Sequence, residues 1–399
     1  MSESFILNEI IALIDLGLDV SILSLMRPSE KKMHEEIMDY DLINKTKYFN
    51  YFSGEGAKSY TSIDIFKKGI IQLFWNKTVH INEKIQLLSL SFKNKMGVET
   101  AVRRFLDYMS IATIIKEKKI KHIHCHFAGQ NVGIAYIINQ VLRIPYTFTT
   151  HAYDIFIDSS KDIVKWANAS KGTITISEFN KKYMFERLGI PLEKTKIVTY
   201  GIYLEKLNPV LEYKTDPFRI ISISRLAEKK GYPYLIEACK ILKERGVEFI
   251  CEIQGDGPAR PKFERMIKEN NLEKEIKLGS ALTRQEVSRF ISTGSVFVLP
   301  CIRASNNDMD GIPNVLMEAM AMEIPVISTK MTGIPELIDN GIDGVIVPPN
   351  DSHALAEAIL KIKTDKVFSE KIRKNGRKKI EDKFNINTNI KKLIRVFEI

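Results

Sequence analysis

Residues 295–329, SVFVLPCIRASNNDMDGIPNVLMEAMAMEIPVIST, contain a complete unit of strand, loop, helix and strand. The branched apolar run at 295–300 predicts a buried strand, and residues 301–312 predict a long loop. Pro313 is a favourable first residue for the short helix that follows, and the apolar run at 324–329 predicts the next strand. Such a unit is the building block of a parallel sheet that is covered by helices.

The same alternation runs along almost the whole chain. Further strands are predicted at 19–25, 120–127, 145–150, 172–177, 218–224, 249–255 and 344–349, and helices at 233–246 and 352–364. These units are too numerous for one doubly wound sheet, and prolines and polar residues interrupt the pattern near 205–217. We therefore predict an α/β protein with two Rossmann-like domains, residues 1–205 and 206–382, that face a central cleft. Residues 383–399 are predicted to form a helix that packs back on the amino-terminal domain.

The amino terminus departs from this pattern. A doubly wound domain opens on a strand, whereas this chain opens on SESFILNEIIALIDLGLDV, a serine followed by an amphipathic helix and then a strand. The first strand of the amino-terminal domain is therefore missing from the pattern. Three explanations stay open: a truncated chain, a start that was placed too late, or a rebuilt amino-terminal sheet.

Composition excludes several classes of protein. Hydrophobic residues make up 44% and charged residues 27% of the 399 residues, which is typical of a globular chain. No apolar run reaches the roughly 18 residues of a membrane-spanning helix, and the start lacks the features of a signal peptide. The four cysteines are scattered, without zinc-binding or redox spacing. We expect a cytoplasmic protein in a reducing compartment.

The formal net charge is +10, and much of it lies in residues 51–120. There, basic side chains alternate with large apolar ones, as in IDIFKKGIIQLFWNK and SFKNKMGVETAVRRF. Such segments can rest on the anionic inner face of a membrane, and the alternative is a set of solvated helix faces. No nucleic-acid-binding motif accompanies the charge, so we expect no nucleic-acid partner.

Two carboxylates flank the turn at residues 311–313. Asp310 precedes the turn, and Glu318 lies about one helical turn beyond it. The loop after a strand and the start of the next helix project into the ligand crevice of such a sheet. Because carboxylates are strong acceptors for hydroxyls, we expect both acids to bind sugar rings, while the N–H groups of Gly311 and its neighbours face phosphates. The alternative is that both acids only complement the dipole of the helix.

Two cations follow the strand predicted at 218–224. Arg225 and Lys230, in SRLAEKKG, lie on the loop that leads into the next helix. Fixed cations at a helix entrance suit a diphosphate leaving group, because negative charge grows there as the bond to the sugar breaks. Alone, the cluster would be solvated surface charge, but the second loop of hydroxyl acceptors favours the leaving-group interpretation.

Histidines mark the corresponding edge of the amino-terminal half. His151 and Asp154 follow the strand at 145–150, where a histidine can bind a sugar or assist an acceptor hydroxyl, or can simply be structural. Upstream, three histidines in HIHCHF share one face of a strand, and His126 is nearest the cleft. This spacing is compatible with zinc, yet no acid or cysteine set completes a site, so we predict no metal.

A Gly-Asp-Gly-Pro turn follows another predicted strand. Gly255 and Gly257 can bring backbone close to a base or ribose, or can only turn the chain. The turn is not a GxGxxG motif, and no acidic residue is placed for a nicotinamide ribose. A dehydrogenase is therefore disfavoured.

Together these motifs resemble the retaining, nucleotide-sugar-dependent glycosyltransferases of family 4, which have the GT-B fold. The most specific feature is the spacing of Asp310 and Glu318, which is similar to the family's E-x7-E motif. Within the family, the chain looks most like exopolysaccharide enzymes of the colanic acid and amylovoran type. The segments that carry this likeness include SESFILNEI, HIHCHFAG, FTTHAYDIF, SRLAEKKG, GDGPAR and GIPELIDNGIDGVIVPPND.

The resemblance implies roles in the carboxyl-terminal half. Glu318 would bind the ribose hydroxyls of the nucleotide, and Asp310 would bind the transferred sugar with help from the backbone of Gly311 and Ile312. Asp310 stands where the family usually has glutamate, which makes its side chain one methylene shorter.

The resemblance also implies the reaction. Arg225 and Lys230 would hold the diphosphate in place of a metal ion, and His151 would face the reacting centre from the other domain. The protein would need no cofactor and would move a sugar from a nucleotide-diphosphate sugar to a saccharide or lipid-linked acceptor, in surface polysaccharide synthesis. The alternatives are a nucleotide-sugar epimerase or a sugar-phosphate glycosyltransferase of the same fold, or a truncated, inactive nucleotide-binding subunit.

Three further positions depart from the family's pattern. Ser224 replaces a glycine before the arginine, and Tyr203 replaces an aspartate. Glu323 replaces a glycine, at a cost of about 1 kcal/mol if its backbone is left-handed.

Overall fold

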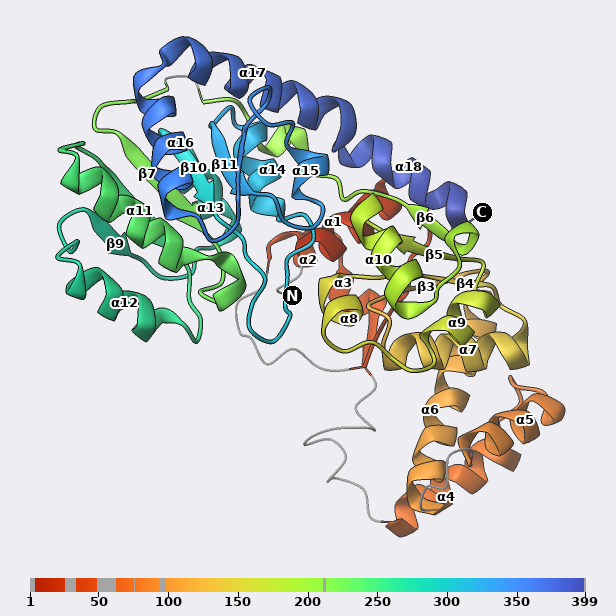
Figure 1. Ribbon diagram of the computed structural model, residues 1–399. Helices are drawn as coiled ribbons and strands as arrows, with labels where there is room; N and C mark the ends of the chain where they lie inside the picture. The colour runs from red at the N-terminus through yellow and green to blue at the C-terminus, as the bar shows by residue number, and fades with distance from the viewer. Residues whose placement is uncertain are drawn as a thin grey trace.

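The computed structural model describes residues 4–25, 34–48, 62–74, 76–92, 98–210 and 213–397. The strands of these residues form three sheets with two, four and six strands, and every pairing within them is parallel. Helices surround the two larger sheets, as predicted for an α/β protein (Figure 1).

The six-stranded sheet belongs to the carboxyl-terminal part of the chain. Its strands lie in the spatial order β12-β11-β10-β7-β8-β9. Their bounds are β7 Arg219–Ile223, β8 Ile250–Gln254, β9 Ile276–Leu278, β10 Val296–Leu299, β11 Val326–Thr329 and β12 Val345–Val347. The order runs outward in opposite directions from β7 and β10, which is the switch point of a doubly wound sheet.

Helices follow each of these strands. They are α11 Tyr232–Glu244, α12 Arg260–Glu269, α13 Arg284–Ile291, α14 Asn314–Ala321, α15 Ile334–Leu337, α16 Ser352–Thr364 and α17 Lys366–Lys383, with a short 3-10 turn, η4, at Glu228–Lys230. All residues of β10 and β11 are buried, which explains why their sequences are continuous apolar runs rather than alternating ones. Pro313 precedes α14 as its N-cap instead of being its first residue.

The four-stranded sheet belongs to the amino-terminal part and has the order β3-β4-β5-β6. Its strands are β3 Ile123–His126, β4 Tyr146–Thr149, β5 Gly172–Thr175 and β6 Thr195–Ile197. The helices around it are α7 Gln130–Leu142, α8 Ala152–Phe156, α9 Ile163–Ala169 and α10 Glu178–Leu188, followed by the 3-10 turns η2 Leu192–Lys194 and η3 Leu204–Lys206.

The amino-terminal sheet is not the single sheet that the alternation predicted. After helix α1 (Ser4–Asp15), strand β1 (Ile22–Ser24) pairs only with β2 (Thr46–Tyr48), which follows α2 (Glu36–Asp39) and α3 (Leu42–Lys45). Among the described residues, no strand joins this pair to β3.

Three helices form a lobe that projects from the amino-terminal part (Figure 1). They are α4 Ser62–Phe74, α5 Ile81–Ser91 and α6 Val98–Glu117, and α6 leads directly into β3. Apolar side chains join α5 and α6 to α7, with Leu87, Phe105 and Met109 almost fully buried. In the described part of the chain, no helix is both long and apolar enough to cross a membrane.

The last helix, α18 (Ile386–Phe397), returns to the amino-terminal part (Figure 1). Its buried residues recur at helical spacing and pack with Leu7 and Ile11 of α1. The ring of Phe397 stacks on His122 with 4.7 Å between centroids. The carboxyl terminus therefore helps to hold α1 against the four-stranded sheet.

Candidate active site

The predicted phosphate and sugar loops meet at the switch point of the six-stranded sheet. Strands β7 and β10 are hydrogen-bonded neighbours, so the loops that follow them leave the same edge side by side. The first loop carries Arg225 and Lys230, and the second carries Asp310, Gly311 and Ile312. The fold thus brings together five residues that the sequence singled out.

An ion pair joins the two loops. Lys230 Nζ lies 2.7 Å from Asp310 Oδ2, and Lys229 Nζ lies 3.4 Å from Asp310 Oδ1 and 3.0 Å from Asp308 Oδ1. Burial alone would raise the pKa of Asp310, but the charges of Lys230 and Lys229 outweigh it and hold the pKa below its usual value. Burial likewise would lower the pKa of Lys230, but Asp310 raises it. Both groups are therefore ionised at neutral pH.

Arg225 lies on the open side of the same loop. Its side chain is exposed, and no ion pair joins it to another residue of the described chain. Behind it, Leu226 N donates to Asp256 O at 2.9 Å, and Ala259 N donates to Leu226 O at 3.1 Å. The Gly-Asp-Gly-Pro turn therefore supports the loop that presents Arg225.

The two glycines of that turn are required by this contact. A Cβ on Gly255, whose φ is +145°, would lie 1.9 Å from Ser224 O, and a Cβ on Gly257 would lie 2.3 Å from Leu226 O. Neither distance is compatible with a side chain. Gly255 and Gly257 thus have a structural reason to be glycine, whether or not they also approach a ligand.

Glu318 projects from the second turn of α14 and is half-buried. Its carboxylate makes no hydrogen bond with the described residues. Burial raises the pKa of Glu318, and the nearby charge of Arg284 partly opposes this effect. A carboxylate in this state is ready to accept hydrogen bonds from a ligand's hydroxyls.

The turn after Asp310 faces the amino-terminal part of the molecule. Thr332 Oγ1 donates to the carbonyls of Asp310 and Gly311 at 2.5 and 2.8 Å, which fixes the turn. The N–H groups of Gly311 and Ile312 donate to no described residue. A Cβ on Gly311 would lie 2.8 Å from Ile176 Cδ1, just beyond β5.

Further contacts join the two parts beside this turn. The carboxylate of Glu336, on α15, accepts hydrogen bonds from Glu178 N at 2.8 Å and Phe179 N at 3.0 Å, at the start of α10. Met309 packs in the same apolar cluster as Ile155 of α8. The sugar loop therefore lies against the helix that follows His151.

His151 and Asp154 form the N-cap of α8. Asp154 Oδ1 accepts from His151 N at 2.7 Å, and Oδ2 accepts from Ala128 N at 2.6 Å. Burial raises the pKa of Asp154 to about 7, and these backbone donors oppose the rise. Asp154 thus holds the backbone of His151 in place, a role that the capping-box spacing explains.

The ring of His151 lies inside the protein, and both of its nitrogens are engaged. Nδ1 lies 2.5 Å from Tyr200 Oη, and Nε2 lies 3.3 Å from His126 Nδ1. His126 Nε2 in turn lies 3.0 Å from Glu9 Oε1. The structure thus brings His126 and His151 together, as the sequence suggested, and adds Glu9 and Tyr200.

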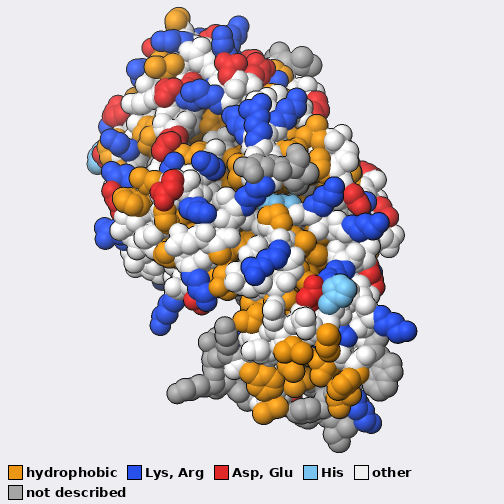
Figure 2. Space-filling model, turned by 90° about the vertical axis from the view of Figure 1, so that its right-hand side faces the viewer, with side chains coloured by type: hydrophobic (Ala, Val, Ile, Leu, Met, Phe, Trp, Pro, Cys, Tyr) orange, Lys and Arg blue, Asp and Glu red, His pale blue; other side chains and the backbone are white. Residues whose placement is uncertain are grey.

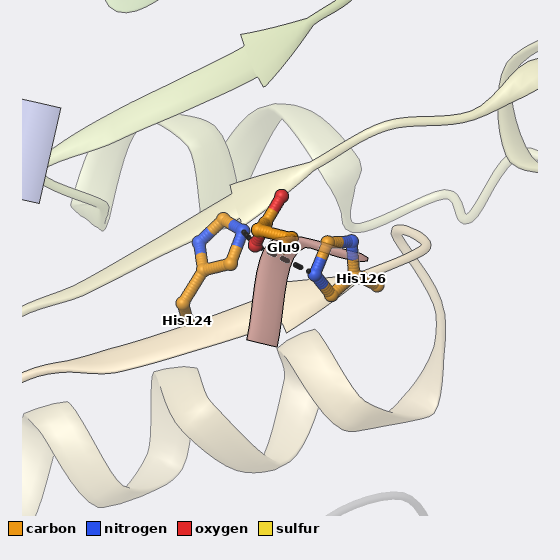
Figure 3. Close-up of side chains that lie close together, drawn as sticks. All are labelled: Glu9, His124 and His126. Atoms are coloured by element: carbon orange, nitrogen blue, oxygen red, sulfur yellow. Dashed lines mark hydrogen bonds and ion pairs between the residues drawn. The ribbon is translucent and has the colours of Figure 1, made fainter. Parts of the chain in front are cut away.

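Glu9, from α1, lies between two rings of β3 (Figure 3). One ligand atom each from Glu9, His124 and His126 lies within 4.8 Å of the others, a set that can hold a metal ion. The expectation that no acid completes the histidine set was therefore wrong, because Glu9 supplies one. His122 is not part of the set, since its Nε2 contacts Thr147 Oγ1 at 2.9 Å.

Glu9 and Glu336 lie in segments that carry the family resemblance, but the sequence analysis assigned neither residue a role. Glu9 is 117 positions from His126, and Glu336 is 158 positions from Glu178. Each pairs across elements whose relative placement only the fold determines. Thr332 and Arg284 lie outside the motifs that the sequence highlighted.

Two protein-family models match the chain. The model described as Glycosyltransferase Family 4 matches residues 78–206, and Glycosyl transferases group 1 matches residues 205–379. Their boundary falls near the interruption in the strand and helix pattern.

Curated proteins and a solved structure are similar over nearly the whole chain. The amylovoran biosynthesis glycosyltransferase AmsK of Erwinia amylovora is 29% identical, over 100% of this chain and 96% of the relative. The putative colanic acid biosynthesis glycosyltransferase WcaL of Escherichia coli K12 is 30% identical, over 96% and 93%. A glycosyltransferase structure from Rickettsia africae superposes with a TM-score of 0.70 at 17% identity, over 99% of this chain and 94% of that one. The chain therefore belongs to the family 4 glycosyltransferases and has their GT-B fold.

Proposed function

We propose that this glycosyltransferase moves a sugar, with retention of configuration and without a metal ion, from a nucleoside diphosphate sugar to a saccharide or lipid-linked saccharide. The observation that carries the proposal is that β7 and β10 are neighbours at the switch point: the loop after β7 holds a fixed cation, Lys230, and the helix after β10 holds Glu318, whose carboxylate makes no hydrogen bond with the described residues. A cation suits the diphosphate, and a free carboxylate suits the ribose hydroxyls.

The remaining groups complete the donor site. Arg225 is exposed beside Lys230, so both cations can stabilise the leaving diphosphate in place of a metal. Asp310 binds the transferred sugar, and the free N–H groups of Gly311 and Ile312 assist.

Retention requires that the acceptor attack from the face that the diphosphate leaves. We propose that the acceptor attacks directly, without a covalent intermediate on the enzyme. The support is that the candidate nucleophiles already contact other groups of the protein. Both ring nitrogens of His151 contact Tyr200 and His126, and Asp310 is held by Lys230. Contact between the two domains would exclude the water that otherwise hydrolyses the donor.

Titration calorimetry with UDP, GDP and ADP tests the donor site. One nucleotide is expected to bind the wild type, and Glu318→Ala is expected to bind it at least tenfold more weakly. Glu237→Ala removes a half-exposed carboxylate from α11 and is the matched control, which should bind normally. Failure of all three nucleotides to bind the wild type would overturn the donor-site proposal.

Product analysis tests the reaction. Free nucleoside diphosphate should appear rapidly only when a saccharide acceptor is present, and a chelator should not change the rate. Conversion of the donor sugar without an acceptor would indicate an epimerase instead. An inverted anomeric linkage in the product would contradict the retaining mechanism.

We further propose that the protein works at the inner, cytoplasmic face of a membrane, where lipid-linked acceptors reside. The support is the helical lobe, whose surface carries many apolar side chains (Figure 2). Exposed apolar residues on or next to α4, α5 and the start of α6 are Ile70, Ile71, Phe74, Ile81, Ile85, Phe92 and Val98. The exposed Lys67, on α4, and Lys77, between α4 and α5, can meet anionic headgroups.

Sedimentation with lipid vesicles tests this surface. Binding to anionic vesicles is expected to exceed binding to neutral ones and to weaken with salt. Phe74 is 69% exposed, so Phe74→Ser should weaken binding about tenfold. The control is Val367→Ser on α17, where an 82% exposed apolar residue lies far from the lobe in sequence. Equal binding by all three proteins would contradict the assignment.

A further inference from the structure

Three side chains that can bind a metal ion converge in the amino-terminal domain (Figure 3). His124 and His126 are two positions apart on β3, so their side chains leave the same face of the strand. Glu9, on α1, faces both of them, with its Oε1 3.6 Å from His124 Nε2 and 3.0 Å from His126 Nε2. One carboxylate and two imidazoles, which are ligand types of zinc sites, therefore meet at one point.

The other nitrogen of each ring is held by a neighbouring side chain. His124 Nδ1 lies 2.8 Å from Thr147 Oγ1, and His126 Nδ1 lies 3.3 Å from His151 Nε2. These contacts leave both Nε2 atoms turned toward Glu9. A histidine that binds a metal ion characteristically has its second nitrogen in such a hydrogen bond, which fixes the ring, so both rings are already oriented for an ion.

Hydrogen bonds hold the three side chains in this arrangement without an ion. Glu9 Oε1 and His126 Nε2 are at hydrogen-bond distance, and His124 Nε2 lies 3.1 Å from Thr149 Oγ1. The side chains of Glu9, His124 and His126 are between 11% and 15% exposed, so they are largely shielded from bulk water. An ion would therefore enter a prearranged site, which lowers the entropic cost of binding.

A cavity beside Glu9 offers the remaining coordination position. The cavity has a volume of about 20 Å³, and its lining includes Glu9, Thr149, Phe5 and Tyr200. This volume is enough for one water molecule. Three protein ligands and one water give the four-coordinate geometry of zinc sites that keep an open position.

The ligand types and their spacing select the class of ion. Two nitrogens and one oxygen suit zinc and similar transition metals, whereas calcium and magnesium prefer oxygen ligands. Zinc bonds of about 2.0–2.1 Å place tetrahedral ligand atoms about 3.3 Å apart, which is close to the 3.6 and 3.0 Å between Glu9 and the two rings. The ligand atoms of His124 and His126 lie within 4.8 Å of each other, a separation that rotation of either ring can shorten.

We propose that Glu9, His124 and His126 bind one divalent transition-metal ion of the zinc type, together with a water molecule, and that the ion joins α1 to β3. Within the described chain, β1 and β2 pair with no strand of the four-stranded sheet, so the ion would add a direct link between the start of the chain and that sheet. The site is independent of the proposed function. Arg225 and Lys230 hold the diphosphate from the other domain, so the proposed transfer step still uses no metal ion.

Calorimetric titration of the untagged, chelator-treated full chain with zinc chloride tests the site. The wild type should bind about one zinc ion per chain. Glu9→Gln, which keeps the size of the side chain but removes its charge, and His124→Asn should each bind zinc at least tenfold more weakly. The matched control is His353→Asn, which removes an exposed histidine from α16 and should bind zinc as the wild type does. Absence of binding by the wild type, or equal binding by all four proteins, would overturn the proposal.

Two further measurements keep the test decisive if a variant folds poorly. Cobalt bound to the wild type should show the intense visible absorption of a tetrahedral site, and the weak absorption of an octahedral ion would overturn the proposal. Zinc at about 100 times its Kd should raise the Tm of the wild type by at least about 2 °C and that of Glu9→Gln by less, and equal shifts would overturn the proposal. A chelator should reverse the rise without changing the transfer rate while the protein stays folded. The binding measurements need no sugar donor, so failure of this inference would be distinguishable from failure of the proposed function.

Discussion

Replacement of Asp310 by asparagine tests how much the negative charge of Asp310 contributes to stability and to ligand binding. The change preserves shape and one oxygen but removes the charge that neutralises Lys230, whose Nζ lies 2.7 Å away. Both side chains are 13% exposed, so water screens the pair only weakly. We expect Asp310→Asn to lower the Tm of the free protein. We also expect a nucleoside diphosphate to raise the Tm of this variant more than it raises that of the wild type.

The size of the effect follows from the burial of the pair. Removal of one partner from a fully buried ion pair costs about 3–5 kcal/mol, and a hydrogen bond to a charged group contributes about 1.5–3 kcal/mol. Because asparagine keeps an acceptor, we expect a loss of about 2 kcal/mol. For a domain of this size, that corresponds to a fall in Tm of about 4–8 °C.

Thermal unfolding with and without the nucleoside diphosphate that binds the wild type measures both effects. Asp308→Asn is the matched control, because Asp308 lies on the same loop and its side chain pairs, among the described residues, with Lys229 at 3.0 Å but not with Lys230. It should lower Tm by less than half as much as Asp310→Asn. The diphosphate supplies the negative charge that Lys230 lacks in Asp310→Asn, so the ligand should raise the Tm of this variant more than that of the wild type. An unchanged Tm for Asp310→Asn, or a smaller ligand shift than in the wild type, would refute the reasoning.

Three further changes have defined outcomes. Gly257→Ala places a Cβ 2.3 Å from Leu226 O and must displace the loop behind Arg225, so kcat/KM for the donor should fall at least tenfold; a wild-type value would show that the loop tolerates the shift. Glu323→Gly relieves a left-handed residue with φ of 57° and should add about 1 kcal/mol of stability, measured by denaturant unfolding; a loss would show that the side chain matters more than the strain. Asp107 is 1% exposed, its carboxylate has no hydrogen-bond partner among the described residues, and burial raises its pKa to about 8. The folded state therefore keeps a proton that the unfolded state releases near pH 4, so the wild type should lose stability as pH rises from about 4 to 8. Asp107→Asn should not show this loss. If the stability of both proteins depends on pH in the same way, this carboxyl is not the cause.

Most strands were predictable from the sequence because a strand of a parallel sheet is buried on both faces and therefore appears as a continuous apolar run. All nine predicted strands are present, and β10 and β11 are fully buried apolar runs. The strands that the sequence analysis missed, β2, β6 and β9, have three residues each with a lysine in the middle, so none of them is a continuous apolar run. The sequence analysis left open whether the backbone of Glu323 is left-handed, and its φ of 57° shows that it is.

The candidate site was predictable only where neighbouring strands of one sheet and the loops after them supply its residues. Asp310 and Lys230 are close because β10 and β7 pair, and the doubly wound order makes that neighbourhood general. Glu9 is different, since its contact with His126 depends on how α1 lies against β3. That placement depends on packing by α18 from the far end of the chain, which no local pattern encodes.

Gly311 has a role in packing between the domains in addition to its expected role as a backbone donor. The sequence analysis expected the N–H group of Gly311 to face phosphates, and the structure supplies a reason for glycine itself, because a Cβ would lie 2.8 Å from Ile176 of the other domain. Gly333 repeats the pattern, since a Cβ there would lie 2.9 Å from Ser177 Cβ. Glu336 then caps the start of α10 beside both glycines, through two hydrogen bonds that are exposed to solvent. Contacts of this kind are close but weak, so under the proposed function we expect the domains to separate to admit a donor and to close over it, with small residues at positions 311 and 333 allowing the close approach.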